Sequence, residues 1–204
     1  MNESVRFMPP SGPQRRHYGK TAIAILLAGL MLSLGACQSS RPLSDRMETK
    51  YSLKKRKSYI SCARPEGRSG CPLPVRVPEL SYRRMLSWIE AAKGTKYRFG
   101  GTAPDGFDCS GFVQYLYSLS FQMQLPRTST DLALLGSIVP RRELKRGDLV
   151  FFSSGGEAID HVGVFLGEER FAHSATKVGV TISSLNQNWY GTHFAFGARV
   201  IRID

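Results

Sequence analysis

The stretch Asp108-Cys109-Ser110-Gly111-Phe112 is the most informative feature of the chain, and it begins a segment with apolar residues at helical spacing. Asp108 is a suitable N-cap, and apolar side chains then recur at helical spacing, at Cys109, Phe112, Val113, Leu116 and Leu119. This pattern predicts a buried helix that starts at Cys109. Free backbone N–H groups and the helix dipole favour negative charge at the first turn, so they would stabilise a thiolate there. A small buried cysteine without chemistry is the alternative, and the polar residues around Cys109 argue against it.

The segments on either side of this helix predict the fold class. Apolar residues from Tyr82 to Ala92 recur at helical spacing before Gly94, which indicates a first amphipathic helix. After the Cys109 helix, Leu125-Pro126-Arg127-Thr128-Ser129 introduces a brief helix through Leu135. β-branched and aromatic runs separated by glycines then predict strands at 148–152, 161–166, 171–175, 178–182 and 194–201. The expected class is α+β, with helices first and an antiparallel sheet of about five strands after them.

Two histidines, His161 and His173, lie in neighbouring predicted strands. Together with Cys109 they supply a nucleophile, a base and a third polar group that can orient the base. Their geometry depends on the intervening turn: a two-residue loop at 168–169 pairs residue 173 with 164 and places the histidines on opposite faces. A three-residue loop, or a bulge, places them on one face. Either histidine could otherwise be an ordinary half-buried strand residue.

Several separated motifs, in this order, resemble the NlpC-type murein peptidases, a papain-like family. The likeness runs from about residue 85 to residue 202. The motifs are Tyr97-Arg98-Phe99-Gly100-Gly101, the stretch 108–112, Leu125-Pro126-Arg127, Gly147-Asp148-Leu149-Val150-Phe151-Phe152, His161-Val162-Gly163-Val164 and Phe171-Ala172-His173-Ser174. The resemblance implies a papain-like fold in which the N-terminal helices pack on the sheet.

The resemblance also implies a role for each site residue. Cys109 would be the nucleophile, His161 the general base and acid, and His173 the residue that orients His161. Tyr97 would lie beside the oxyanion, which the backbone N–H of Cys109 also stabilises. An ion pair between His161 and Cys109 would hold the thiol pKa below its free value of about 8.5. No cofactor or metal is expected.

The implied reaction is hydrolysis of an amide in peptidoglycan stem peptides through a thioester. Family members cut either the D-glutamyl to diaminopimelate bond or the cross-link between diaminopimelate and D-alanine, and likeness to the small lipoprotein members favours the cross-link. One alternative is a non-hydrolytic wall-binding or scaffold lipoprotein, which would normally lack Cys109 or His161. Another is an amidase or acyltransferase with the same triad. We expect a monomer.

The N-terminus has the layout of a secretory signal. An apolar run at 21–34 follows Arg15, Arg16 and Lys20. The sequence Leu34-Gly35-Ala36-Cys37 resembles a bacterial lipobox, which predicts a signal peptide at 1–36 and lipid on Cys37. An uncleaved signal anchor is the alternative. Because residue 38 is glutamine rather than aspartate, likeness to other lipoproteins favours an outer-membrane anchor with the domain facing the periplasm.

The basic residues are concentrated between the signal and the domain. The chain carries a formal charge of +12, yet residues 38–78 hold ten Lys or Arg against three Asp or Glu, and residues 79–204 hold fourteen against twelve. This distribution argues against nucleic acid as a partner. The predicted organisation is a lipidated basic linker at 37–78 followed by a catalytic domain at 79–204. The run Lys54-Lys55-Arg56-Lys57 is either a solvated charge run or a contact with anionic lipid or wall carboxylates.

Two further cysteines, Cys62 and Cys71, flank a flexible Gly/Pro-containing stretch. Export favours a disulfide between them, since exposed thiol pairs become oxidised in the periplasm. Two free thiols or half of a metal site are the alternatives, and no histidine lies near enough in the sequence to favour the metal.

Overall fold

The structure is a computed structural model that describes residues 43–64 and 67–204. The predicted signal peptide at 1–36 and Cys37 lie outside the described residues. No helix of the described part of the chain is long and apolar enough to cross a membrane.

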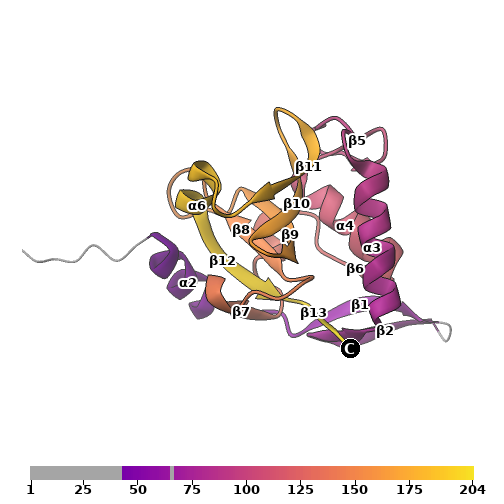
Figure 1. Ribbon diagram of the computed structural model, residues 1–204. Coiled ribbons are helices and arrows are strands. Elements are labelled where there is room, and N and C mark those ends of the chain that lie inside the picture. The colour runs from indigo at the N-terminus through magenta and orange to yellow at the C-terminus, as the bar shows by residue number, and fades with distance from the viewer. Residues whose placement is uncertain (1–42, 65–66) are drawn as a thin grey trace, which may run out of the picture. The chain divides into compact units, whose positions relative to one another are not determined.

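A six-stranded antiparallel sheet forms the centre of the fold, in the strand order β11-β10-β9-β8-β12-β7 (Figure 1). The strands are β7 (Ser137–Val139), β8 (Leu149–Phe152), β9 (His161–Gly167), β10 (Arg170–Ala175), β11 (Gly179–Ser184) and β12 (Phe194–Arg199). The α+β class is confirmed, with six strands where about five were predicted. The additional strand is β7, which has only three residues and pairs with β12 at the edge of the sheet.

One helix packs on the sheet at β9 and β10, and a second helix packs on the first. Helix α4 (Cys109–Phe121) packs on both strands, and helix α3 (Glu79–Ala92) packs on α4 (Figure 1). The buried side of α3 carries Tyr82, Met85, Ile89 and Ala92, the spacing that predicts this helix. The shorter helical elements are α5 (Ser129–Leu132), α6 (Asn188–His193) and a 3-10 turn η1 (Arg141–Glu143). Two short strands, β4 (Thr102–Ala103) and β5 (Gly106–Phe107), form a hairpin before α4.

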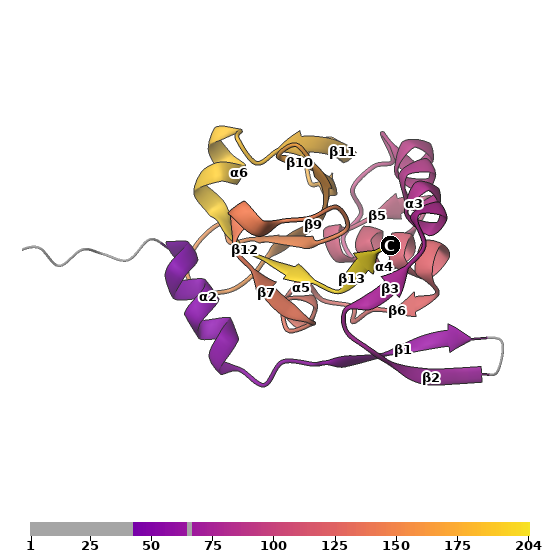
Figure 2. The same cartoon turned by 60° about the horizontal axis from the view of Figure 1, so that its bottom comes forward.

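The segment before α3 differs from the predicted linker. Its described part forms a helix and three strands, α2 (Leu43–Leu53), β1 (Tyr59–Arg64), β2 (Gly67–Pro72) and β3 (Val75–Val77) (Figure 2). Helix α2 packs on β12, β1 pairs with β6 (Met123–Gln124), and β3 runs parallel to β13 (Ile201–Ile203). In α2, Met47 and Tyr51, four residues apart, are buried. Two apolar residues are too few to produce a periodic pattern, so the sequence predicts only a linker for this segment.

A disulfide joins Cys62 and Cys71 across the β1–β2 hairpin. Their Cα atoms lie 6.0 Å apart. In the register Cys62 faces Ser69 and Cys71 faces Ile60, so the two cysteines are diagonal neighbours rather than a directly opposed pair. The bond closes a short loop, which restricts the unfolded chain.

Candidate active site

The start of α4 is held by the carboxylate of Asp108. Its Oδ1 accepts a hydrogen bond from the Gly111 N–H at 2.7 Å, and its Oδ2 accepts one from the Gly100 N–H at 3.0 Å. Arg127 binds both carboxylate oxygens, with Nη1 3.0 Å from Oδ1, and donates to Ser110 Oγ at 2.9 Å. Burial alone would raise the pKa of Asp108, but the hydrogen bonds from Arg127, Gly111 and Gly100, together with the charge of Arg127, hold that pKa below its usual value. Asp108 is therefore an ionised, fixed cap.

Glycines let the loop before α4 approach the helix closely. The Asp108 N–H donates to Gly101 O at 3.0 Å. A Cβ on Gly111 would collide with that same Gly101 carbonyl, and a Cβ on Gly101 would collide with Gly106 O. Gly111 is therefore required by the carbonyl of Gly101, and Gly101 is required by the carbonyl of Gly106.

Cys109 is the first residue of α4 and its side chain is buried. Its Sγ lies 3.9 Å from Asp160 O. Burial, and then the charge of Asp108, raise the pKa of the thiol; the backbone N–H groups of Cys109, Ser110 and Val162 lower it, with a smaller total effect. The net shift of the thiol pKa is upward. The prediction that this pKa lies below the free value is therefore wrong, because the effect of burial exceeds that of the N–H groups at the helix start.

The turn between β9 and β10 decides how the histidines face each other. Glu168 and Glu169 both have positive φ, 52° and 58°, which makes a tight two-residue turn between Gly167 and Arg170. The register then shifts, because Phe171 pairs with Phe165 and the strand bulges at residue 166.

The bulge shifts the pairing in the same way as a three-residue loop would. Ala172 pairs with Val164, so His173 lies across from Gly163 and on the same face as His161. Gly163 has no side chain to separate the strands there, and a Cβ on it would lie 3.2 Å from the His173 Cβ. The loop itself has two residues, and the extra residue of the bulge shifts the register by one, which places the two histidines on the same face of the sheet.

The two imidazoles form a hydrogen-bonded pair. His161 Nε2 lies 2.8 Å from His173 Nδ1, and the rings are nearly perpendicular, at 86°. His173 Nε2 in turn lies 2.9 Å from Ser183 Oγ and 3.3 Å from the Tyr190 hydroxyl. Ser183 of β11 and Tyr190 of α6 cannot be recognised from the sequence, because nothing in their local sequence indicates that they contact His173.

Both histidines are neutral near pH 7. Burial lowers the pKa of His161 to about 4, with partial opposition from the charge of Asp160. Burial, and then the neighbouring His161, lower the pKa of His173 to about 3. At neutral pH the two imidazoles and the Cys109 thiol are therefore uncharged.

The start of β9 meets the start of α4 at the sulfur of Cys109. Asp160, which precedes His161, places its carbonyl oxygen against Sγ, and Val162, which follows His161, directs its N–H toward it. The backbone on both sides of His161 thus contacts the thiol. The structure brings the three predicted residues of the triad into one site.

Tyr97 precedes the loop that leads into α4. Its segment is held to β5 by a bridge to Phe107 and by the Arg98 N–H, which donates to Phe107 O at 3.0 Å. Burial, and then the charges of Cys109 and Asp108, raise the pKa of the Tyr97 phenol. The phenol is therefore near enough to Cys109 to be affected by its charge. It keeps its proton and can donate a hydrogen bond.

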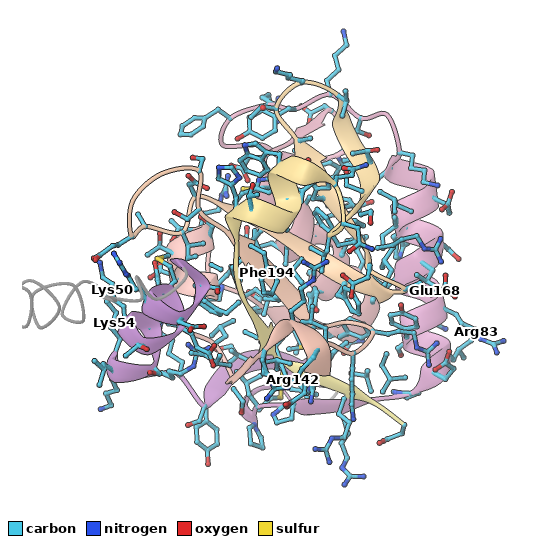
Figure 3. The ribbon with its side chains drawn as sticks, turned by 60° about the vertical axis from the view of Figure 1, so that its left-hand side comes forward. Lys50, Lys54, Arg83, Arg142, Glu168 and Phe194 are labelled. Atoms are coloured by element: carbon cyan, nitrogen blue, oxygen red, sulfur yellow. A yellow bond between two sulfur atoms is a disulfide. The ribbon has the colours of Figure 1, made fainter. Side chains whose placement is uncertain are left out.

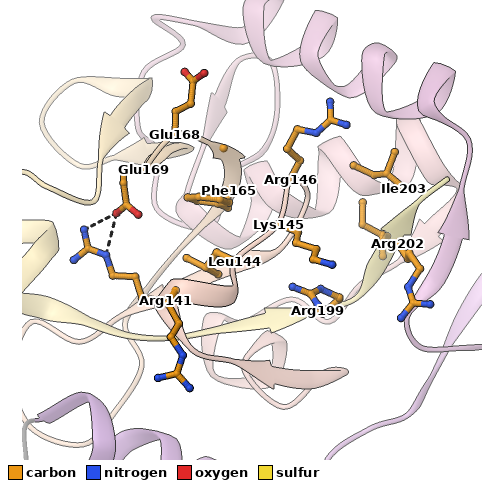
Figure 4. A pocket seen from close by; sticks show the side chains of 13 residues that line it. Arg141, Leu144, Lys145, Arg146, Phe165, Glu168, Glu169, Arg199, Arg202 and Ile203 are labelled. Carbon is orange, nitrogen blue, oxygen red and sulfur yellow. Dashed lines mark hydrogen bonds and ion pairs between the residues drawn. The ribbon is translucent and has the colours of Figure 1, made fainter.

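The site contains no candidate metal centre: across 43–64 and 67–204, no group of three or more His, Cys, Asp or Glu is placed to hold an ion. A cavity of about 920 Å³ lies at the far end of β9, near Phe165 and Glu168 rather than His161 (Figure 4). Arginines and lysines line much of it, and Arg141 donates from Nη2 to Glu169 at 2.5 Å. This basic cavity is separate from the thiol and the histidine pair.

A thiol at the capped start of a helix, next to a histidine pair on an antiparallel sheet, defines a papain-like cysteine hydrolase. Residues 94–199 match the model of the NlpC/P60 family, and the chain belongs to that family. The resemblance given by the separated motifs is confirmed, and the family is one of cysteine peptidases that act on peptidoglycan.

Curated relatives and solved structures agree with this assignment. The chain is 32% identical over 87% of its length to a probable endopeptidase NlpC homolog of Haemophilus influenzae, and covers 97% of that protein. It is 39% identical over 58% of its length to the Escherichia coli murein DD-endopeptidase MepS/murein LD-carboxypeptidase, and covers 62% of it. The NlpC/p60 domain of the peptidoglycan hydrolase SagA superposes with a TM-score of 0.51 at 26% identity, over 57% of this chain and 97% of that domain.

Proposed function

We propose that this protein is a peptidoglycan endopeptidase that cleaves amide bonds of murein stem peptides with Cys109 as nucleophile. The observation that carries the proposal is the Cys109 thiol at the capped start of α4, contacted by the backbone on both sides of His161. Family membership and relatives named as murein endopeptidases support the substrate class. The assembled histidine pair argues against a purely scaffolding role.

The histidine pair fixes which nitrogen acts on the thiol. With Nε2 of His161 bonded to His173, the Nδ1 atom is left to exchange a proton with Cys109. For Nδ1 to act as a base, Nε2–H must donate to His173 Nδ1, and His173 Nε2–H then donates to Ser183 Oγ. His173 and Ser183 hold the reactive tautomer of His161.

The reaction begins from the neutral pair. As Sγ attacks the amide carbon, the thiol proton moves to His161 Nδ1 and the carbonyl electrons move to oxygen. The backbone N–H of Cys109 and the Tyr97 hydroxyl stabilise that oxyanion. When the tetrahedral intermediate collapses, the C–N bond breaks and His161 gives its proton to the leaving amine, which leaves a thioester. His161 then takes a proton from water as the water oxygen attacks the thioester carbon. When the C–S bond breaks, His161 returns that proton to the Cys109 sulfur, so the acid product leaves and the neutral thiol and imidazole are restored.

We favour the cross-link between neighbouring stem peptides as the bond that is cut. Two Escherichia coli relatives are named murein DD-endopeptidases, one 39% and one 41% identical to this chain over the matched residues. Digestion of defined muropeptides, followed by mass spectrometry, tests this choice. We expect cross-linked dimers to give monomers with intact stems; cleavage within the stem of an uncross-linked monomer would identify the D-glutamyl to diaminopimelate bond instead.

We also propose that Cys37 carries lipid and that the protein is a monomeric outer-membrane lipoprotein whose domain faces the periplasm. The lipobox-like Leu34-Gly35-Ala36-Cys37 supports this. Membrane fractionation with radiolabelled palmitate tests it. Cys37→Ala should release an active, unlabelled protein, whereas a parent protein that binds membranes without label would overturn the lipid assignment.

A further inference from the structure

Tyr51 lies outside the segment that matches the family, yet it touches the loop that leads into the catalytic strand. It is a residue of α2, the helix that Figure 3 brings forward with Lys50 and Lys54 labelled. Its side chain is 1% exposed, and its ring packs on Phe196 with the centroids 5.2 Å apart. Its hydroxyl oxygen accepts a hydrogen bond from the Ile159 N–H at 3.1 Å.

The same residue, Ile159, is held from a second element. Its carbonyl oxygen accepts hydrogen bonds from Ser129 Oγ at 3.3 Å and from Thr130 Oγ1 at 3.2 Å, both in α5. The N–H and the C=O of Ile159 are therefore tied to two different helices. Its side chain is also buried, at 2% exposure.

The next residue, Asp160, carries this restraint to the reacting sulfur. The Asp160 carbonyl oxygen lies 3.9 Å from Cys109 Sγ. Its carboxylate accepts a hydrogen bond from the Ser154 N–H at 2.9 Å, which closes the loop on itself. His161 follows immediately as the first residue of β9. A shift of Ile159 would therefore move both the backbone that contacts the thiol and the base.

We propose that Tyr51 is a positioning residue for the catalytic site, acting through Ile159 on Asp160 and His161. This proposal rests on the proposed function, because the loss of activity is measured as cleavage of muropeptides. Without the hydroxyl, the buried Ile159 N–H has no acceptor at this position, which disfavours the present loop conformation. Small displacements of catalytic groups are costly, since a misplacement of about 1 Å can lower a rate about a hundredfold.

A second contact joins α2 to this loop, but it restrains the loop less than the Tyr51 hydrogen bond does. Lys50 Nζ lies 2.5 Å from Glu157 Oε2, and both side chains are largely exposed, at 40% and 64%. Exposed ion pairs of this kind contribute little. The restraint on the loop from α2 is therefore assigned to Tyr51.

Tyr51→Phe tests the proposal, with Tyr117→Phe as the matched control. Tyr117 is also a buried tyrosine whose hydroxyl makes one backbone hydrogen bond, to Gly147 O at 2.5 Å, away from the thiol. The readouts are Tm, the pH profile of iodoacetamide alkylation of Cys109, and kcat and KM on muropeptides. We expect both variants to lose Tm, and only Tyr51→Phe to shift the alkylation profile and lower kcat about tenfold with little change in KM.

Parent-like kcat and alkylation in Tyr51→Phe, or equal losses in both variants, would overturn the proposal. If Tyr51→Phe does not fold, Ser129→Ala combined with Thr130→Val releases the same residue from the α5 side and should produce the same shift. Alkylation needs no murein substrate. A parent protein that cuts no muropeptide would therefore contradict the proposed function, while a changed alkylation profile would still support the positioning role.

Discussion

The Nε2 atom of His161 lies 2.8 Å from the Nδ1 atom of His173, across two strands joined by a two-residue turn. A turn of that length alone would place the side chains on opposite faces of the sheet, and the bulge at residue 166 brings them onto one face. An irregularity in the strand therefore assembles the histidine pair.

His173→Ala should lower kcat roughly a hundredfold, at the lower end of what general acid–base catalysis contributes. The variant removes the partner of His161 Nε2, so the imidazole loses its orientation and its tautomer. Steady-state kinetics on muropeptides measures the effect. His193→Ala is the matched control, because His193 stacks on Trp189 outside the pair and its replacement should leave kcat unchanged. Equal effects of the two variants would contradict the assigned role of His173.

Gly163→Ala should lower both stability and activity. The added Cβ would lie 2.7 Å from Phe171 Cδ2 and 2.8 Å from Ala172 O, so β10 would have to move and carry His173 with it. Overpacking of this kind typically costs about 1–3 kcal/mol. Gly155→Ala is the control, since a Cβ there meets nothing within 4 Å. Chemical denaturation and kcat on both variants provide the measurement; a parent-like Gly163→Ala would show that the strands are not this tightly packed.

The ultraviolet absorbance of the thiolate should appear only on the alkaline side of a pH titration. The pKa of the Cys109 thiol is raised above its ordinary value and that of His161 is lowered to about 4, so both groups are uncharged between the two pKa values. Activity should rise as pH increases through about 4, where His161 becomes a free base, and fall when the thiol ionises. A pH–rate profile alone does not separate this from an ion pair, because both forms carry one proton. Thiolate absorbance that appears near pH 4 and disappears in His161→Ala would demonstrate the ion pair.

The folded state should lose stability as pH falls below 6.5. In the unfolded chain His173 titrates near 6.5, whereas in the fold its pKa is about 3, so between these values the unfolded state binds more protons. Stability then increases with pH across this window, and the loss attributable to His173 is about 2 kcal/mol by pH 5. Denaturant unfolding at pH 7 and pH 5 tests this. His173→Gln should show a smaller loss than the parent, and equal losses would mean that His173 is not held neutral.

The sequence predicts the parts of the fold that carry a repeated pattern. Helices α3 and α4 each bury a stripe of at least four apolar residues, and the glycine-separated runs correspond to β8 through β12. Strand β7 and helix α2 bury too few residues to show a period. Strand β7 is specified by its pairing with β12, and α2 by its packing on that strand.

The residues of the site also fall into those that the sequence predicts and those that it does not. Cys109, His161 and His173 are apparent from residue types and order, because the chemistry of a thiol nucleophile requires them. The partners that hold them are not: Arg127 reaches Asp108 from nineteen residues away, and Ser183 reaches His173 from the next strand. Such contacts depend on tertiary packing, which local spacing does not encode. The raised thiol pKa likewise follows from burial, and the position of Cys109 at a helix start alone predicts the opposite direction.

Digestion of purified peptidoglycan by the parent protein and by Cys109→Ala, side by side, tests most directly whether the Cys109 thiol cuts murein peptides. Both proteins should unfold at similar temperatures, because the change is small and the Asp108 cap remains. We predict that the parent releases products that each contain a new amine or a new carboxylate at the cut bond, and that Cys109→Ala releases none. Release of the same products by Cys109→Ala at near the parent rate would show that another group performs the reaction.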